Sequence, residues 1–213
     1  MQRRGTMYKN PVITIARQYG SGGREIGEKV AELLGIKAYG KELIDLAAEK
    51  SGYHPDMLHK ADERAAGSLL YSLAVGASVA GGIAGHYDIP INDKLFIVQN
   101  DIIKELAEKE QCVIIGRCGD YALRNFENKI SVFIHSDFEW RKKRIVEKNG
   151  VSEKEAENLI IKEDKYRANY YNFYTGHKWG ASERYDATFN SSMLGVDAIA
   201  QIIANMARNN SAN

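Results

Sequence analysis

Cysteine and net charge are both scarce in this sequence. Only two cysteines occur among 213 residues, Cys112 and Cys118, and 29 Lys and Arg residues nearly balance 28 Asp and Glu residues. Because nothing at the start of the sequence resembles a secretory signal, so few cysteines favour reduced thiols and a cytoplasmic protein. The net charge of +1 gives no global field typical of a nucleic-acid binder, so any basic site must be local.

Long apolar runs are scarce as well, and residues 67–85 form the one uncharged stretch that suggests a membrane. This stretch is rich in Gly and Ser, is barely of spanning length, and lacks an aromatic belt and a strong basic flank. We therefore favour a glycine-loosened helix or mobile flap over a membrane span, and we expect no membrane partner. A flap suits an enzyme that must exclude water.

Apolar strand patterns alternate with helical patterns along the rest of the chain. The length fits one α/β domain, or one domain carrying a smaller lid. Strands are predicted over 12–15, 112–115, 130–134 and, more weakly, 187–189. Helices are predicted over 25–34, 41–50, 93–110, 138–148, 152–171 and 196–208. Strands separated by helices indicate a three-layer α/β/α fold with a mainly parallel sheet covered on both faces.

A glycine-rich loop joins the first predicted strand to the first predicted helix. Gly20, Gly22 and Gly23 remove side chains where the backbone must turn and bring its N–H groups towards an anion. The loop then opens a helix that stops at Gly35, and the N-terminus of a helix favours phosphate. The pattern predicts a phosphate-binding loop; a glycine turn in another kind of strand-to-helix unit is the alternative.

The loop lacks the lysine of the usual phosphate-binding motif, Gly-x4-Gly-Lys-Ser/Thr. We align it without gaps on the form found in nucleoside monophosphate kinases, Gly-Pro-Pro-Gly-Ser-Gly-Lys-Thr-Thr. Arg17 then takes the first Gly, Gly23 takes the Lys, and Arg24 and Glu25 take the hydroxyl pair. We expect Arg17 or Arg24 to supply the missing charge and Glu25 to hold Mg²⁺, since carboxylates suit that ion.

Arginines follow the next two buried strands. Arg117 lies just past a glycine after the strand at 112–115, a position suited to bidentate phosphate binding, with a surface salt bridge to Asp120 as the alternative. Arg141 and Arg144 share one face of the helix after the strand at 130–134 and could reach one polyphosphate. A solvated helix face is the simpler interpretation of that basic run.

A second pair of charges and an aromatic group lie further along. Asp164 and Arg167 share a helix face, either as an intrahelical pair or as part of a lid that neutralises phosphate charge. Between 169 and 185 aromatic side chains gather; packing of an irregular segment is favoured over stacking on a nucleobase. The five histidines are scattered without ligand spacing, so His177 predicts no metal site.

The order of these motifs resembles the cytidylate kinase-like family of P-loop nucleoside monophosphate kinases, in its branch with a Gly-Ser-Gly-Gly-Arg-Glu loop. The segment 116–120 looks like the Gly-Arg-Asp segment that contacts the acceptor nucleotide. Residues 164–167 resemble the Asp-Ser-x-Arg lid motif, and 185–192 resemble the Asp-Ala-x-x-Ile-Asp-Thr-Ser tract of the last strand. The chain departs from the family at two places. Gly23 replaces the lysine, and the acceptor-binding arginine expected around 37–46 is missing, which leaves Lys41 as the only nearby cation.

This resemblance implies a P-loop NTPase fold with a helical lid, ATP and Mg²⁺ as cofactors, and a small nucleotide as substrate. Residues 1–10 would be a loose leader and 11–213 a single domain, with an acceptor-side insert at about 40–90 and a lid at about 138–180. The implied catalytic residues are Arg24, Arg117, Arg141, Arg144 and Arg167. The implied donor-binding residues are Arg17, Gly20, Ser21, Gly22, Gly23, Arg24 and Glu25. The implied acceptor-binding residues are Lys41, Arg117, Asp120, Asp164 and Arg167.

Two functions from different classes follow from these predictions. The first is an ATP-dependent phosphotransferase acting on CMP or a related nucleotide or small phosphorylated acceptor. The second is a nucleotide-binding or regulatory protein that kept the fold and lost the chemistry together with the lysine. Neither needs nucleic acid, and a homodimer stays an option.

Overall fold

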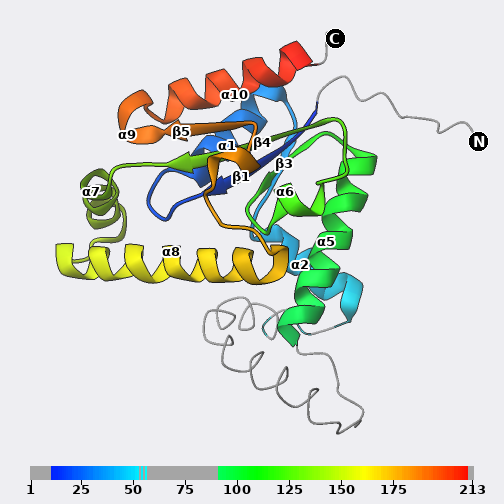
Figure 1. The fold of residues 1–213 in the computed structure, drawn as a ribbon, viewed down its shortest axis with the longest axis horizontal. Coiled ribbons are helices and arrows are strands. Elements are labelled where there is room, and N and C mark those ends of the chain that lie inside the picture. Colours follow the sequence, from blue (N-terminus) through cyan, green and yellow to red (C-terminus); the bar gives the residue numbers. More distant parts are fainter. Residues whose placement is uncertain (1–10, 53, 55, 57–90, 211–213) are drawn as a thin grey trace, which may run out of the picture.

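The structure is a computed structural model that describes residues 11–52, 54, 56 and 91–210 (Figure 1). The predicted leader at 1–10, most of the insert at 40–90 and the uncharged stretch at 67–85 lie outside the described residues. Within the described ranges, no helix combines the length and the apolar character that a membrane crossing needs.

A five-stranded, wholly parallel sheet forms the centre of the fold. Its spatial order is β2-β3-β1-β4-β5. The strands are β1 (Val12–Arg17), β2 (Lys37–Tyr39), β3 (Cys112–Ile115), β4 (Lys129–His135) and β5 (Ala187–Asn190). The four predicted strands are confirmed, whereas β2 was not predicted, because three half-exposed residues make no readable apolar run.

Helices cover both faces of the sheet, so the predicted three-layer α/β/α fold is confirmed (Figure 1). On one face, α1 (Gly23–Leu34) and α10 (Val196–Asn210) pack against a core that includes Ile13 and Ile199. On the other face, α2 (Glu42–Ser51), α5 (Ile91–Lys109) and the short α6 (Gly119–Ala122) enclose a core that includes Leu43 and Ile114. Alternate residues of the buried strands thus serve opposite layers, as a parallel sheet requires.

A pair of helices, α7 (Phe138–Asn149) and α8 (Glu153–Thr175), packs through a small core of its own around Ile145 and Ile160. The hydroxyl of Ser152 accepts a hydrogen bond from the Glu155 backbone N–H at 3.2 Å, as the predicted cap requires. The helix α8 continues beyond its predicted end and stops at Gly176 in a left-handed conformation (φ 70°). The prediction of an irregular aromatic segment was therefore wrong for its first half, which is helical.

The chain returns to the sheet through a 3₁₀ turn, η1 (Ser182–Arg184), and β5. The short helix α9 (Ser191–Leu194) follows β5 and leads into α10. Because β1, β2 and β3 pair in parallel, their carboxyl ends lie at the same edge of the sheet, near the α7–α8 pair (Figure 1).

Candidate functional site

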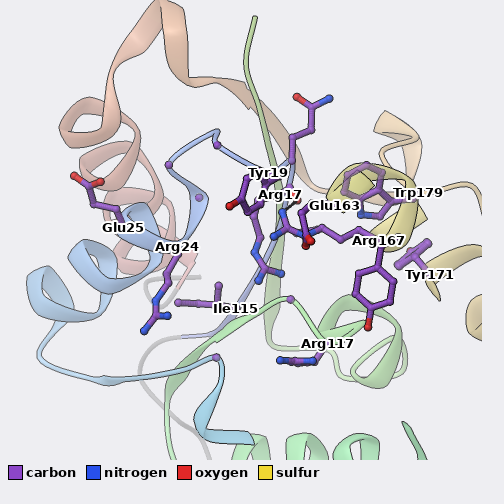
Figure 2. Close-up of a pocket in the computed structure, with 18 of the residues that line it drawn as sticks. Arg17, Tyr19, Arg24, Glu25, Ile115, Arg117, Glu163, Arg167, Tyr171 and Trp179 are labelled. Atoms are coloured by element: carbon purple, nitrogen blue, oxygen red, sulfur yellow. Dashed lines mark hydrogen bonds between the residues drawn. The ribbon is translucent and has the colours of Figure 1, made fainter. Parts of the chain in front are cut away.

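A cavity of about 400 Å³ lies at the carboxyl ends of the central strands. Its walls come from the loop after β1, the ends of β2 and β3, and the facing sides of α7 and α8. Figure 2 shows the lining residues that come from the β1 loop, the end of β3 and α8. This volume lies within the range of small-molecule sites, and ligands of open α/β sheets bind at this edge. The predicted site residues that line the cavity are Arg17, Gly20, Gly22, Gly23, Arg24, Glu25, Lys41, Arg117, Asp120, Arg144 and Arg167.

The glycine loop has the geometry of an anion-binding turn. Gly20 and Gly22 have φ angles of 78° and 77°, a region that side chains rarely adopt. Gly22 caps α1, and Gly23 is the first residue of that helix. Gly22 and the first residues of α1 line the cavity, and at a helix N-terminus the unpaired N–H groups and the helix dipole favour negative charge.

Ser21 anchors this loop. It is fully buried, its hydroxyl donates to the Gln18 carbonyl at 2.9 Å, and its own carbonyl accepts from the Ser191 hydroxyl at 2.7 Å. The Ser21 side chain is thus engaged within the protein and does not line the cavity, which differs from its predicted place.

Arg17, Arg117 and Arg167 come from three different elements and turn towards the same space (Figure 2). Burial lowers the pKa of Arg17 well below its ordinary value, and the nearby charges of Arg167, Arg117 and Arg24 lower it further. Arginine keeps its proton in proteins. The cavity therefore concentrates positive charge that an anionic ligand would neutralise.

The backbone that presents Arg117 is strained. Gly116, Arg117 and Cys118 all have left-handed φ angles, of 80°, 57° and 52°. Such a conformation costs roughly 1–2 kcal/mol for a residue with a side chain, and strain of this kind gathers at functional sites. The strained turn places the Arg117 side chain at the cavity (Figure 2).

Arg167 is held from its own helix against the glycine loop. Its Nη1 donates to the Arg17 carbonyl at 3.0 Å, and its guanidinium lies 5.4 Å from the centre of the Tyr19 ring. Burial lowers its pKa, while Asp164 and Glu163 partly offset that effect. Arg167 thereby joins α8 to the end of β1.

Arg141 and Arg144 on α7 are already ion-paired. Arg141 is buried, and its Nη1 bonds to the Asp164 carboxylate at 2.5 Å and to the Tyr19 carbonyl at 3.1 Å. Asp164 also accepts from the Tyr19 N–H at 2.6 Å. Neither Arg141 nor Asp164 lines the cavity, so their predicted places in the site are not observed, and Asp164 pairs with Arg141 across the two helices.

The other α7 arginine pairs with the predicted metal ligand. Arg144 bonds to the Glu25 carboxylate, although both residues line the cavity. Among the described residues, no cluster of three or more His, Cys, Asp or Glu side chains could hold a metal ion. These residues therefore do not fit a magnesium site built by the protein, and the engaged Glu25 does not fit the predicted role.

Two further predicted cations lie at the margin of the cavity. Arg24 is 54% exposed and pairs with Glu28, one helical turn away, at 2.7 Å. Lys41 is exposed and follows β2 at the N-terminus of α2. Since neither is buried, each would interact with an anion through solvent-screened charge.

Asp120 lines the cavity and accepts a hydrogen bond from the Tyr171 hydroxyl at 2.6 Å. Burial raises the pKa of Asp120, although the Tyr171 hydrogen bond acts in the opposite direction. Burial and the neighbouring Asp120 raise the pKa of the Tyr171 hydroxyl. Asp120 and Tyr171 thus form a buried polar pair in the cavity wall.

Aromatic side chains of α8 and the following loop form another part of the wall: Tyr166, Tyr170, Tyr171 and Trp179. Some members of the aromatic group also pack, as predicted, since Tyr174 stacks on Phe96 with ring centres 4.2 Å apart. Sequence reasoning assigned no site role to Gln18, Tyr19 or Glu163, which also line the cavity. The helical spacing of Glu163, Tyr166, Arg167 and Tyr170 was the available signal, because these residues share one face of α8.

Fold and site together define a three-layer α/β/α protein whose glycine loop lies between its first strand and its first helix, at the edge of the cavity. Residues 12–193 match the cytidylate kinase-like family. The chain therefore belongs to the cytidylate kinase-like family, as its motif order predicted.

Several solved structures are similar to this chain. An uncharacterized protein from Eubacterium ventriosum is 31% identical with a TM-score of 0.69, covering 92% of this chain and 97% of that one. A shikimate kinase from Acinetobacter baumannii is 14% identical, with a TM-score of 0.49 and 96% of each chain covered. A shikimate kinase from Bacteroides thetaiotaomicron is 16% identical, with a TM-score of 0.49 and coverage of 92% and 97%. No curated protein matches the sequence.

Proposed function

We propose that this protein is an ATP-dependent phosphotransferase of the nucleoside monophosphate kinase type. Its acceptor would be CMP, a related nucleotide or another small phosphorylated molecule. One observation carries this proposal: a glycine loop at a helix N-terminus shares a cavity with Arg17, Arg117 and Arg167. Phosphoryl transfer spreads negative charge over donor, acceptor and transferred group, and such a cluster neutralises it.

Each part of the cavity has a role in this proposal. The N–H groups of residues 20–24 cradle the donor phosphates, as helix N-termini do. Arg117, with Lys41 at the margin, holds the acceptor phosphate, since a guanidinium binds phosphate oxygens through two parallel hydrogen bonds. Arg167, and Arg144 if it exchanges Glu25 for phosphate, close over the transferred group. Positioning and charge neutralisation then supply most of the rate.

The aromatic wall suits the non-phosphate part of a ligand. Tyr166, Tyr170 and Trp179 offer ring faces and edges within the cavity, and such surfaces contact nucleobases or other flat groups. ATP would bring Mg²⁺ bound to its own phosphates, an ion that usually keeps several waters and substrate oxygens as ligands.

Transfer of labelled γ-phosphate from ATP tests this function. The purified full chain is incubated with ATP and, separately, with CMP, UMP, other nucleoside monophosphates and small phosphorylated metabolites. We expect labelled product with at least one acceptor. The Arg117→Ala variant serves as the control for contaminating kinases, because it should lose that product.

A second candidate function is a nucleotide-binding or regulatory protein without transfer activity. The absence of a side chain at Gly23 and the engagement of Glu25 by Arg144 favour this candidate. It predicts that nucleotides raise the melting temperature while no acceptor in the panel becomes labelled. A cytoplasmic location and a homodimer also remain proposals, and light scattering on the eluting protein would test the homodimer.

A further inference from the structure

We infer that Arg17 is the cation that binds the donor phosphates, and that the arginine at position 17 and the glycine at position 23 depend on each other. The usual motif carries its phosphate-binding lysine at position 23, in the first turn of α1, whereas this chain carries the charge at the end of β1. The ligand class is a nucleoside di- or triphosphate bound through its phosphates. Arg17's role rests on the phosphotransferase function proposed above, because that function places a nucleotide in this cavity.

The first argument is steric. A Cβ atom at position 23 would lie 2.5 Å from the Arg17 Cβ and 2.8 Å from its Cγ. Gly20 and Gly22 need left-handed φ angles, but Gly23 has no such angle and begins an ordinary helix. Glycine is therefore required at position 23 because the stem of Arg17 occupies that space, so a lysine there is incompatible with Arg17.

A second contact fixes the other end of Arg17. A Cβ atom at Gly116 would lie only 1.8 Å from the Arg17 Nη1. The guanidinium thus lies against bare backbone at the end of β3, next to Arg117. The Arg17 side chain thus passes from β1 into the cavity through space that is free only because positions 23 and 116 carry no side chain.

The third argument compares Arg17 with the other candidate cation of the loop. The charges that act most strongly on Arg17 belong to Arg167, Arg117 and Arg24, all of the same sign. Arg24 instead is exposed and bound to Glu28. An anion would relieve repulsion at Arg17 but would have to compete with a carboxylate and solvent at Arg24.

Equilibrium binding provides the first test. ATP is titrated by calorimetry into the wild type, Arg17→Met, Arg24→Met and the matched control Lys143→Met, with adenosine as the phosphate-free probe. Arg17→Met should weaken ATP binding about 10- to 100-fold, the range expected for a lost charge-assisted hydrogen bond. Arg24→Met, which removes the rival cation of the loop, should weaken it by less than about threefold. Lys143→Met should keep the wild-type affinity, and adenosine binding should be the same in all four proteins.

A stability cycle tests the exchange without any ligand. Gly23→Ala should lower the melting temperature of the wild type, because its Cβ collides with Arg17. The same substitution in an Arg17→Gly background should leave the melting temperature unchanged or raise it, since alanine is a better helix residue than glycine. The double variant Arg17→Gly/Gly23→Lys should fold and should bind ATP more tightly than Arg17→Gly does. The backbone carbonyl at position 17 remains in this variant and can still accept the hydrogen bond from Arg167.

The outcomes separate this inference from the proposed function. The role of Arg17 in binding would be overturned by normal ATP affinity in Arg17→Met, or by equal losses of affinity in Arg17→Met and Arg24→Met. The dependence between positions 17 and 23 would be overturned if Gly23→Ala changed the melting temperature equally in the wild type and in Arg17→Gly. Phosphate-dependent ATP binding that needs Arg17, without transfer to any acceptor, would support it and would refute the phosphotransferase function instead.

Discussion

The arginines around the cavity fall into two groups, the pair on α7 and the pair formed by Arg17 and Arg167. The groups differ in what neutralises the charge of their guanidinium groups. Arg141 and Arg144 each bind a carboxylate, from Asp164 and Glu25 respectively. In the described part of the chain, neither Arg17 nor Arg167 forms an ion pair with a carboxylate. Burial lowers the pKa of both; other arginines lower that of Arg17 further, whereas Asp164 and Glu163 partly offset the effect at Arg167. A count of cations in the lid sequence could not reveal this difference.

The comparison separates structural from ligand-binding charge. A buried arginine paired with a carboxylate joins two segments, and removing one partner leaves an uncompensated buried charge. An arginine surrounded by like charges is costly until an anion arrives. Basic residues of one small region thus divide into those that pair with a carboxylate and those that do not, and the second group contains the residues that we propose bind phosphate.

The largest effect is expected from breaking the buried pair. Arg141→Met should lower the free energy of unfolding by about 3 kcal/mol, because the partly buried Asp164 carboxylate loses its partner. Urea denaturation followed by circular dichroism measures this loss. A double variant, Arg141→Met/Asp164→Leu, should recover much of it; equal instability of the double variant would show that the pair is not what stabilises this contact.

Arg117 belongs to the cavity and should affect turnover more than stability. Arg117→Ala should lower kcat/KM for an accepted substrate about 100- to 1,000-fold, the usual cost of removing one preorganised charge-stabilising group. Unchanged turnover would refute the role. Arg117→Gly should lose as much activity and yet be roughly 1 kcal/mol more stable than Arg117→Ala, because glycine adopts the left-handed φ of 57° without strain.

Arg167 should link ligand binding to stability. At 100 times its Kd, ATP should stabilise the wild type by about 2.7 kcal/mol, or about 5–11 °C in melting temperature for a chain of this size. Arg167→Met should reduce that shift, measured by differential scanning fluorimetry. Lys143→Met on the exposed face of α7 is the matched control and should keep the full shift; equal loss in both would contradict the distinction between the two groups.

A smaller, pH-dependent effect is expected at Asp120. Burial raises its pKa above the ordinary 3.8, so the folded state binds the proton more tightly than the unfolded state. The contribution of Asp120 to stability is therefore greatest below pH 3.8 and falls as pH rises through the raised value. Asp120→Asn should be more stable than the wild type at pH 7, with the advantage shrinking as pH falls towards 4. An advantage that grows on acidification would reverse this assignment.

Much of the fold was predictable because its signals are local. Continuous apolar runs marked β1, β3 and β4, and glycines marked the ends of α1 and α7. The parallel arrangement then placed the glycine loop and Arg117 at one edge of the sheet. Among the strands, β2 escaped prediction, since its three exposed or half-buried residues owe their strand geometry to pairing with β3. The one-turn helices α6 and α9 were not predicted either, because four residues show no helical periodicity.

The partners of the charged residues were not predictable, because they lie far apart in the chain. Asp164 contacts Arg141 across 23 positions, and Glu25 contacts Arg144 across 119. Sequence spacing instead suggested an Asp164–Arg167 pair within one helix. The close approach of Arg17 to Gly23 likewise depends on how the end of β1 turns under α1, which no periodicity encodes.

Calorimetric titration of the wild type with ATP, AMP and adenosine tests the central claim most directly, namely that the cavity arginines bind a ligand through its phosphates. Affinity should rise with each added phosphate and should fall as salt is raised, because charge supplies the binding. Adenosine binding as tightly as ATP, or ATP affinity independent of salt, would contradict the assignment of this cavity to phosphate.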